Sequence, residues 1–234
     1  MTPLAALTGV SGFLGGHVAA AFEAAGWRLR ALTRRDPRLD IGPEPVELVL
    51  GDLDRPDALA ALTRGADAVV HVAGVIRGRR PEDFLPVNRD GTAALARAWR
   101  EGAPSALFVL VSSLAARAPR ISPYAASKRA GEDAAQEIVG EALRVLRPAA
   151  VYGPGDRETL SLFKAARMPV QPMLGPPQGR VALVHAADVA AAVLAAASGA
   201  PAGLYEVADP SPEGYAWSRI VEQACRAVGA RPRR

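Results

Sequence analysis

The residue types that are rare in the sequence exclude several classes of protein. Cys225 is the one cysteine among 234 residues, which excludes an internal disulfide and a cysteine-based metal cluster. A single cysteine fits a reducing compartment, so we expect a cytoplasmic protein. The apolar stretch Val189 to Ala197 is too short to cross a bilayer. No basic flank precedes the apolar residues at the start, so we expect neither a signal peptide nor a membrane partner.

Aromatic residues are also scarce, at 5% of the chain, and they do not accompany the basic residues. The formal net charge is +4, and the arginines are spread out, with small clusters at Arg34-Arg35, Arg79-Arg80 and 231–234. A nucleic-acid-binding surface would place aromatic residues among such clusters. We therefore expect no nucleic-acid partner, and we interpret an arginine cluster as an anion site only where a motif supports it.

What the chain has in abundance is Ala, Val and Leu, arranged in alternating strand-like and helix-like segments. We predict strands at 4–8, 27–32, 46–50, 68–72, 107–111, 143–146 and 204–207, and helices at 15–25, from 56, 88–100, 123–139, 187–197 and 217–228. Such alternation is typical of βαβ units that form a parallel sheet.

With right-handed crossovers these units give a doubly wound α/β (Rossmann) fold over residues 1–150. Residues 151–234 are expected to form a small substrate-binding lobe that is interleaved with the core and not independent. The stretch "MPVQPMLGPPQG", Met168 to Gly179, is dense in Pro and Gly and predicts an irregular loop. Its proline and methionine residues suggest a roof over an apolar substrate.

The first strand runs into a glycine-rich turn, "LTGVSGFLGGHV". Glycine permits a tight turn, a close approach of backbone to phosphate, and close packing of the helix on the strand. The helix N-terminus adds free N–H groups and partial positive charge, which suit a pyrophosphate. The turn therefore predicts dinucleotide binding by Gly9, Ser11, Gly12, Phe13, Leu14 and Gly15.

The end of the second strand bears on the choice of cofactor. NAD-preferring folds place an acidic residue there to hold the ribose 2′-hydroxyl, but in "RALTRRD" that position holds Thr33. Arg34 and Arg35 follow, and their planar guanidinium groups suit a 2′-phosphate. We therefore favour NADP over NAD. Asp36 is the main argument against this choice, and the two arginines alternatively belong to the solvated surface.

Two further strand ends fit the same ligand. In "GDLDR", Asp52 and Leu53 follow the third strand, where a carboxylate can accept from the adenine amino group; alternatively, Asp52 or Asp54 caps the helix that begins near Pro56. In "HVAG", which ends the fourth strand, we expect Val72, Ala73 and Gly74 to let the ligand pass close to the backbone. His71 is interpreted as a packed residue rather than as a base.

The strongest chemical signal is "SPYAASKRAGE", where Tyr124 and Lys128 lie four residues apart on a predicted helix and so share one face. A neighbouring ammonium lowers the pKa of a phenol, which then serves as an acid or base near neutral pH. In "FVLVSS", the fifth strand leads through Val111 to Ser112 and Ser113, at the sheet edge where ligands bind. The serines alternatively end the strand or cap the next turn.

These motifs, in order, resemble the short-chain dehydrogenase/reductase superfamily in its extended, epimerase/dehydratase-like branch: "TGVSGFLG", "GDLD", "HVAG", "VNRDGT", "VSS", "YAASK", "RPAAVYGPGD" and "VHAADVA". The resemblance implies that Tyr124 is the general acid/base. It also implies that Lys128 supports the tyrosine and binds the nicotinamide ribose. Ser113, with Ser112 as the alternative, would orient the substrate.

By the same resemblance Asn88 lies near the cofactor, and Pro148 and Val151 line the nicotinamide. Asp188 fixes a helix of the lobe. A homodimer through the helices that carry Asn88 and Tyr124 is implied as well.

Two departures from the branch affect the predicted function: the run from Ser113 to Tyr124 is short, and so is the chain. They argue against a nucleotide-sugar pocket. The sequence therefore predicts an NAD(P)-dependent oxidoreductase that transfers a hydride between nicotinamide and a small carbonyl or secondary alcohol. The alternatives are an epimerase-type enzyme with a reduced lobe and a non-catalytic NADP-binding regulator.

Overall fold

The computed structural model describes residues 2–35, 46–168, 179–211 and 213–230. The chain forms two compact units, each built from two separate stretches. Unit 1 comprises Met1–Pro148 and Ala187–Val207, and unit 2 comprises Ala149–Ala186 and Ala208–Arg234. The predicted lobe, residues 151–234, therefore does not coincide with unit 2, because 187–207 complete unit 1. Most of the predicted irregular loop at 168–179 lies outside the described residues.

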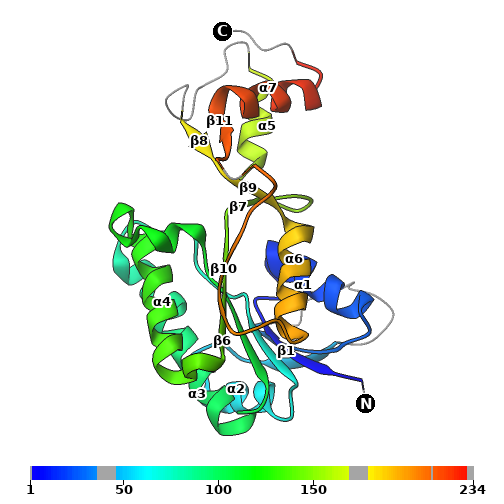
Figure 1. Cartoon of the computed structure of the whole chain (residues 1–234), viewed down its shortest axis with the longest axis vertical. Helices are drawn as coiled ribbons and strands as arrows, with labels where there is room; N and C mark the ends of the chain where they lie inside the picture. Colours follow the sequence, from blue (N-terminus) through cyan, green and yellow to red (C-terminus); the bar gives the residue numbers. More distant parts are fainter. Residues whose placement is uncertain (1, 36–45, 169–178, 212, 231–234) are drawn as a thin grey trace. The chain divides into compact units, whose positions relative to one another are not determined.

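Unit 1 is built on a seven-stranded sheet in the order β10-β6-β5-β4-β1-β2-β3 (Figure 1). All of its strand pairs are parallel. The strands are β1 (Leu4–Thr8), β2 (Arg28–Thr33), β3 (Glu47–Leu50), β4 (Ala68–His71), β5 (Leu107–Val111), β6 (Leu143–Pro148) and β10 (Gly203–Val207). The chain winds outward in both directions from the β1–β4 pair, which confirms the predicted doubly wound α/β fold.

Helices cover both faces of this sheet. In Figure 1, α2 (Pro56–Thr63), α3 (Thr92–Gly102) and α4 (Pro123–Val139) lie on one face, and α1 (Phe13–Ala24) and α6 (Ala186–Ala197) lie on the other. Because both faces are covered, the central strands consist almost wholly of apolar residues. Phe108, Leu95 and Trp99 are among the buried side chains between the sheet and the first of these layers.

The predicted elements of unit 1 exist, with small shifts at their ends. The largest difference is at the predicted helix 88–100, where a π-helical turn, Pro86–Gly91, precedes α3. The connection from β5 to α4 is ordered as two short 3₁₀ turns, Leu114–Arg117 and Pro119–Ile121. A further 3₁₀ turn, Pro81–Asp83, follows β4. A π turn inserts one extra residue per turn and is frequent at functional sites.

Helix α4 begins and ends where its sequence dictates. The Ser122 hydroxyl accepts a hydrogen bond from the Ala125 N–H at 3.1 Å, and Pro123 occupies the first turn. Both features favour a helix start. Gly140, at φ +67°, ends the helix in the left-handed region. These signals place Tyr124 in the first turn of α4, next to the end of β5.

Unit 2 is smaller and less regular. Two short parallel strands, β7 (Ala150–Tyr152) and β9 (Leu183–His185), pair with each other. Two antiparallel ones, β8 (Arg180–Val181) and β11 (Tyr215–Ala216), form a second pair. Helices α5 (Leu160–Ala166) and α7 (Trp217–Ala227) pack together around the buried Cys225. None of the helices in the described part of the chain combines the length and apolarity of a bilayer-spanning segment.

Candidate active site

The glycine turn after β1 is held in close contact with the end of β4. Gly9 adopts φ +81°, and a Cβ there would lie 2.6 Å from the Ala73 nitrogen. A Cβ on Gly15 would lie 1.9 Å from the Gly9 carbonyl oxygen. Side chains are therefore excluded at both positions, and the turn closes tightly onto the start of α1. Ser11 and Gly12 are exposed on its outer side, while Phe13, Leu14 and Gly15 form the first turn of the helix.

Helix α1 begins at this turn without a side-chain cap and without an acidic residue in its first turn. Its first N–H groups are therefore left for an external acceptor. The positive end of the helix, the bare backbone and the position beyond the carboxyl end of β1 together fit a pyrophosphate. The residues present at this turn therefore fit a dinucleotide.

The ends of β2 and β3 carry the residues predicted to contact the adenosine part of the cofactor. At the end of β2, the buried Thr33 hydroxyl donates to the Arg35 carbonyl, so the threonine fastens a turn from which Arg34 and Arg35 extend into solvent. At the end of β3, the exposed Asp52 carboxylate accepts from the N–H of the buried Leu53 at 2.8 Å. The capping alternative for Asp52 and Asp54 is wrong, because the N-cap of α2 is Arg55 and it lacks a side-chain cap bond.

Asn88, in the π-helical turn, acts as a clamp inside the site. Its side-chain oxygen accepts from the Val75 N–H at 2.8 Å, and its side-chain nitrogen donates to the Val75 carbonyl at 2.9 Å and to the Ser127 Oγ at 2.9 Å. Ser127 Oγ in turn donates to the Tyr124 carbonyl at 2.8 Å. The buried Asn88 amide is thus occupied in joining the loop after β4 to helix α4.

Tyr124 and Ser113 meet at the carboxyl edge of the sheet. The Ser113 hydroxyl caps the following 3₁₀ turn by accepting from the Ala115 N–H at 3.2 Å. Burial raises the pKa of Tyr124, and the neighbouring Ser113 hydroxyl acts in the opposite direction. The sequence predicted a pKa of Tyr124 lowered by Lys128; the structure gives a raised pKa, because desolvation of the phenol dominates.

Lys128 lies one helical turn below Tyr124 and is buried. Its Nζ donates to the Val111 carbonyl at 2.9 Å, which leaves two of its three N–H bonds for other acceptors. Burial lowers the pKa of Lys128 to about 8, against the opposing pull of Glu132 one turn further along. Glu132 forms a buried two-pronged ion pair with Arg147 of β6, with N–O distances of 2.9 Å and 2.5 Å.

Gly74, after β4, lies next to Lys128. Gly74 is exposed, and a Cβ there would lie 3.2 Å from the Asn88 side-chain oxygen and 3.7 Å from the Lys128 Nζ. A side chain at position 74 would therefore occupy the space beside the lysine. Val72 and Ala73, which precede it, are half-buried. The predicted role of the "HVAG" stretch, to leave room for a ligand beside the backbone, fits this geometry.

The remaining predicted residues fall into four positions. Val111 ends β5 and Ser112 follows it, and the buried Ser112 hydroxyl has no hydrogen-bond partner among the described residues. Pro148 is the last residue of β6. Val151 belongs to β7 of unit 2. Asp188 lies in the first turn of α6, where the helix dipole favours a carboxylate.

Sequence reasoning missed several residues that support the site. Ser127 lies inside the "YAASK" stretch but carries no pattern of its own. Phe84 is buried with its ring centroid 6.1 Å from that of Tyr124. Thr8 and Thr92 flank His71 with hydrogen bonds of 2.7 Å and 2.9 Å. The one local signal for these residues was the position of Thr8, directly before the first glycine of the turn.

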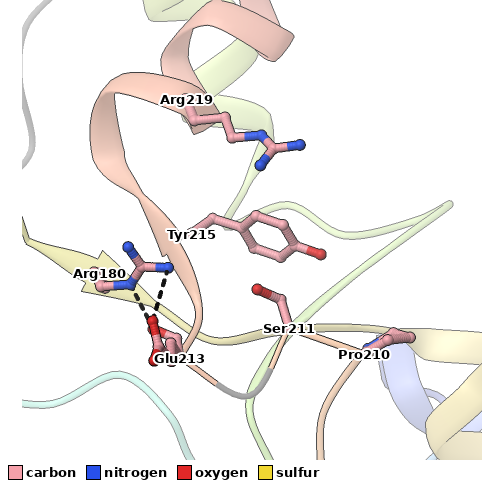
Figure 2. A pocket seen from close by; sticks show the side chains of 6 residues that line it. All are labelled: Arg180, Pro210, Ser211, Glu213, Tyr215 and Arg219. Atoms are coloured by element: carbon pink, nitrogen blue, oxygen red, sulfur yellow. Dashed lines mark hydrogen bonds and ion pairs between the residues drawn. The ribbon is translucent and has the colours of Figure 1, made fainter.

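A separate hollow of about 510 Å³ lies within unit 2 (Figure 2), lined by Arg180, Pro210, Ser211, Glu213, Tyr215 and Arg219. Arg180 donates to the carbonyls of Glu213 and Gly214 at 2.8 Å and 2.7 Å. The Arg219 guanidinium lies over the Tyr215 ring, 5.7 Å from its centroid. The polar groups that line the hollow therefore largely contact each other. None of these lining residues was predicted as a site residue.

Comparison with known proteins supports the same assignment. A family model described as "NAD dependent epimerase/dehydratase family" matches residues 5–208. A ceramide reductase of Caulobacter vibrioides is 49% identical over 230 residues, which cover 97% of this chain and 71% of the relative. A GDP-6-deoxy-D-mannose reductase of Pseudomonas aeruginosa is 33% identical over 193 residues, covering 71% of this chain and 58% of that protein.

Among solved structures, MoeE5 in complex with UDP-glucose and NAD has a TM-score of 0.80 at 24% identity, covering 98% of this chain and 83% of that chain. The UDP-N-acetylglucosamine 4-epimerase of Bacillus cereus has a TM-score of 0.81 at 20% identity, covering 99% of this chain and 83% of that one. These likenesses establish the shared fold. Taken with the family match along most of the sequence, they show that the chain belongs to the NAD dependent epimerase/dehydratase family of enzymes.

Proposed function

We propose that this chain is an NADPH-preferring reductase that converts a ketone of an apolar, ceramide-like lipid into a secondary alcohol. The observation that carries the proposal is that Ser113, Tyr124 and the buried Lys128 lie together at the carboxyl edge of the sheet, with Gly74 next to the lysine. The 49% identity to a ceramide reductase supports the substrate class. It extends the sequence-based expectation of a small apolar carbonyl to a larger lipid ketone.

The chain's own residues provide the proton chemistry. When bound, a reduced nicotinamide supplies the hydride to the carbonyl carbon. Tyr124 donates its phenolic proton to the carbonyl oxygen, and its raised pKa keeps that proton in place at neutral pH. Ser113 orients the same oxygen by a hydrogen bond. Water then returns a proton to the phenolate, so ketone, hydride and proton are converted into the alcohol.

Lys128 acts on both the tyrosine and the cofactor. Its pKa of about 8 leaves it mainly charged at neutral pH, so the ammonium stabilises the phenolate that forms during the reaction. Its remaining N–H bonds would hold a ribose hydroxyl of the cofactor. Gly9, Gly12, Gly15 and the first turn of α1 would hold the pyrophosphate, and Asp52 would accept from the adenine.

Cofactor preference is assigned to Arg34 and Arg35. Both are exposed at the end of β2, where Thr33 leaves no carboxylate to hold a 2′-hydroxyl. A 2′-phosphate placed there would accept charge-assisted hydrogen bonds from the guanidinium groups. Replacing both arginines by alanine should weaken NADPH binding about tenfold to a hundredfold, from the usual strength of such bonds, with little effect on NADH.

The test is oxidation of NADPH or NADH by the purified chain with three substrates: a ketone-bearing ceramide analogue in micelles, a GDP-linked keto sugar, and a short aliphatic ketone. We expect turnover with the lipid ketone and NADPH. Turnover with the keto sugar but not with the lipid would instead assign a nucleotide-sugar activity like that of the Pseudomonas relative. Equal binding of NADPH and NADH, unaffected by loss of the two arginines, would refute the cofactor assignment.

A further inference from the structure

A continuous chain of hydrogen bonds runs through the buried interior from the cofactor-binding turn to the catalytic helix. It begins at the Ala73 N–H, which donates to the Thr8 Oγ1 at 3.3 Å. It passes through His71, whose two ring nitrogens lie 2.7 Å from Thr8 Oγ1 and 2.9 Å from Thr92 Oγ1. Thr92 Oγ1 donates to the Asn88 carbonyl at 2.9 Å. From Asn88 the chain continues through Ser127 to the Tyr124 carbonyl.

One protonation of His71 satisfies all of these contacts. When the hydroxyl proton of Thr92 goes to the Asn88 carbonyl, Thr92 Oγ1 accepts from the imidazole, so the ring proton lies on His71 Nε2. His71 Nδ1 then accepts from the Thr8 hydroxyl. Thr8 Oγ1 is then free to accept from the Ala73 N–H. In this arrangement of protons every donor in the row of hydrogen bonds has an acceptor, and the arrangement requires that the His71 ring is neutral.

The elements that these bonds join are those that must be aligned for hydride transfer. Thr8 directly precedes Gly9, and Ala73 precedes Gly74, so one end fixes the backbone around the cofactor-binding turn. At the other end, the Asn88 carbonyl lies against Gly131 of α4 so closely that a Cβ there would be 2.1 Å away. Helix α4 therefore packs directly against the backbone of the π-helical turn, and Tyr124 lies in the first turn of the same helix.

We propose that His71 is a positioning residue for the reaction, holding the cofactor-binding turn and the Tyr124 helix in register through its neutral, Nε2-protonated ring. The catalytic test of this proposal rests on the proposed function. The spectroscopic test rests on the hydrogen-bond geometry alone. Sequence reasoning interpreted His71 as a packed residue; the structure adds that its packing aligns the two halves of the site. A displacement of one ångström at such a site is enough to slow a reaction strongly.

The catalytic test uses Thr92→Val, which removes the hydroxyl between His71 and Asn88 at nearly constant volume. Thr63→Val is the matched control, because Thr63 is also buried and its hydroxyl also bonds helix carbonyls, those of Leu59 and Ala98, away from the site. We expect Thr92→Val to lower kcat about tenfold to a hundredfold while the dissociation constant of NADPH changes less than threefold. Thr63→Val should change kcat less than twofold, and Thr92→Ser should recover most of the lost rate.

Equal effects of the two valine variants on kcat would overturn the inference, as would a loss confined to NADPH affinity. The spectroscopic test needs no activity: ¹⁵N-labelled histidine in the whole chain should show the His71 ring as the neutral Nε2–H tautomer throughout pH 5 to 8. The signal is assigned by its loss in His71→Asn. An Nδ1–H tautomer, or titration near pH 6.5, would refute the proposal even if the protein reduced no ketone tested.

Discussion

The buried ion pair between Glu132 and Arg147 provides the sharpest test of how the site is supported. The side chains are 7% and 9% exposed, and two hydrogen bonds join them from α4 to β6. Removing one partner of such a pair leaves a buried charge without compensation, which costs about 3–5 kcal/mol. We therefore expect Arg147→Met, which keeps most of the apolar stem, to destabilise unit 1 by about that amount. Lys128, one turn from Glu132, places the loss toward the lower end.

The expected loss is large enough to measure by thermal unfolding. For a unit of this size, 1 kcal/mol corresponds to about 2–4 °C in Tm, so Arg147→Met should lower the Tm by about 6–20 °C. Far-UV circular dichroism and urea unfolding would supply two independent readouts. The matched control is Arg129→Met, which breaks the exposed Arg129–Asp133 pair on the same helix. That pair is expected to contribute about 0.3–0.5 kcal/mol.

A double variant separates the charge from the packing. Glu132→Leu combined with Arg147→Met replaces the pair by apolar groups and should recover most of the stability, because no unpaired charge remains. If Arg147→Met costs no more than Arg129→Met, the pair does not stabilise unit 1 in the way its geometry suggests. If the double variant is as unstable as the single one, the loss comes from packing and the electrostatic reasoning fails.

Three further outcomes are expected. Gly15→Ala should abolish dinucleotide binding and lower the Tm, because its Cβ would lie 1.9 Å from a carbonyl oxygen. Gly16→Ala, which has open space around its Cβ, should instead raise the free energy of unfolding by about 0.5–1 kcal/mol. Scanning calorimetry with and without NADPH distinguishes the two variants, and equal behaviour would contradict the tight turn. Tyr124→Phe should lower kcat about 10²–10⁴-fold at unchanged NADPH affinity, while Tyr205→Phe, which removes an exposed hydroxyl bonded to the Pro201 carbonyl, should leave kcat unchanged; activity retained in Tyr124→Phe would exclude the phenol as the acid. Burial, aided by Lys128, lowers the pKa of His71 to about 3 from about 6.5 in the unfolded chain. The contribution of His71 to stability is therefore complete above pH 6.5 and is lost as the pH falls toward 3, by about 2 kcal/mol between pH 7.5 and 5. Urea unfolding at these two pH values measures the loss, and equal stability at both would show that the fold does not keep His71 neutral.

Much of unit 1 was predictable because its signals are local. The strands at Leu4–Thr8 and Leu107–Val111 and the helix at Pro123–Val139 have the predicted bounds, since apolar runs and capping residues mark their ends in the sequence. The short elements of unit 2, such as α5 and the pair β7 and β9, were not predicted. Their runs of three to seven residues are too short to show a period, and they depend on tertiary contacts.

The candidate site shows the same division. Tyr124 and Lys128 were predicted to share a helical face because their spacing is a local property. The hydrogen bonds of Asn88 to Val75 and Ser127 span 13 and 39 residues, and no spacing rule predicts them. The raised pKa of Tyr124 was missed for a related reason: the sequence shows which charge lies one turn away but not how completely water is removed from the phenol.

The edge strand β10 has a consequence for how the polypeptide is made. It pairs in parallel with β6, yet 54 residues separate the end of one strand from the start of the other, because β6 ends at Pro148 and β10 starts at Gly203. A ribosome must therefore synthesise most of unit 2 before the last strand of the sheet emerges. Until then the outer side of β6 exposes unpaired N–H and C=O groups, a known template for aggregation. A fragment cut near residue 150 would remain in that unfinished condition, so the two units are best expressed as one continuous chain.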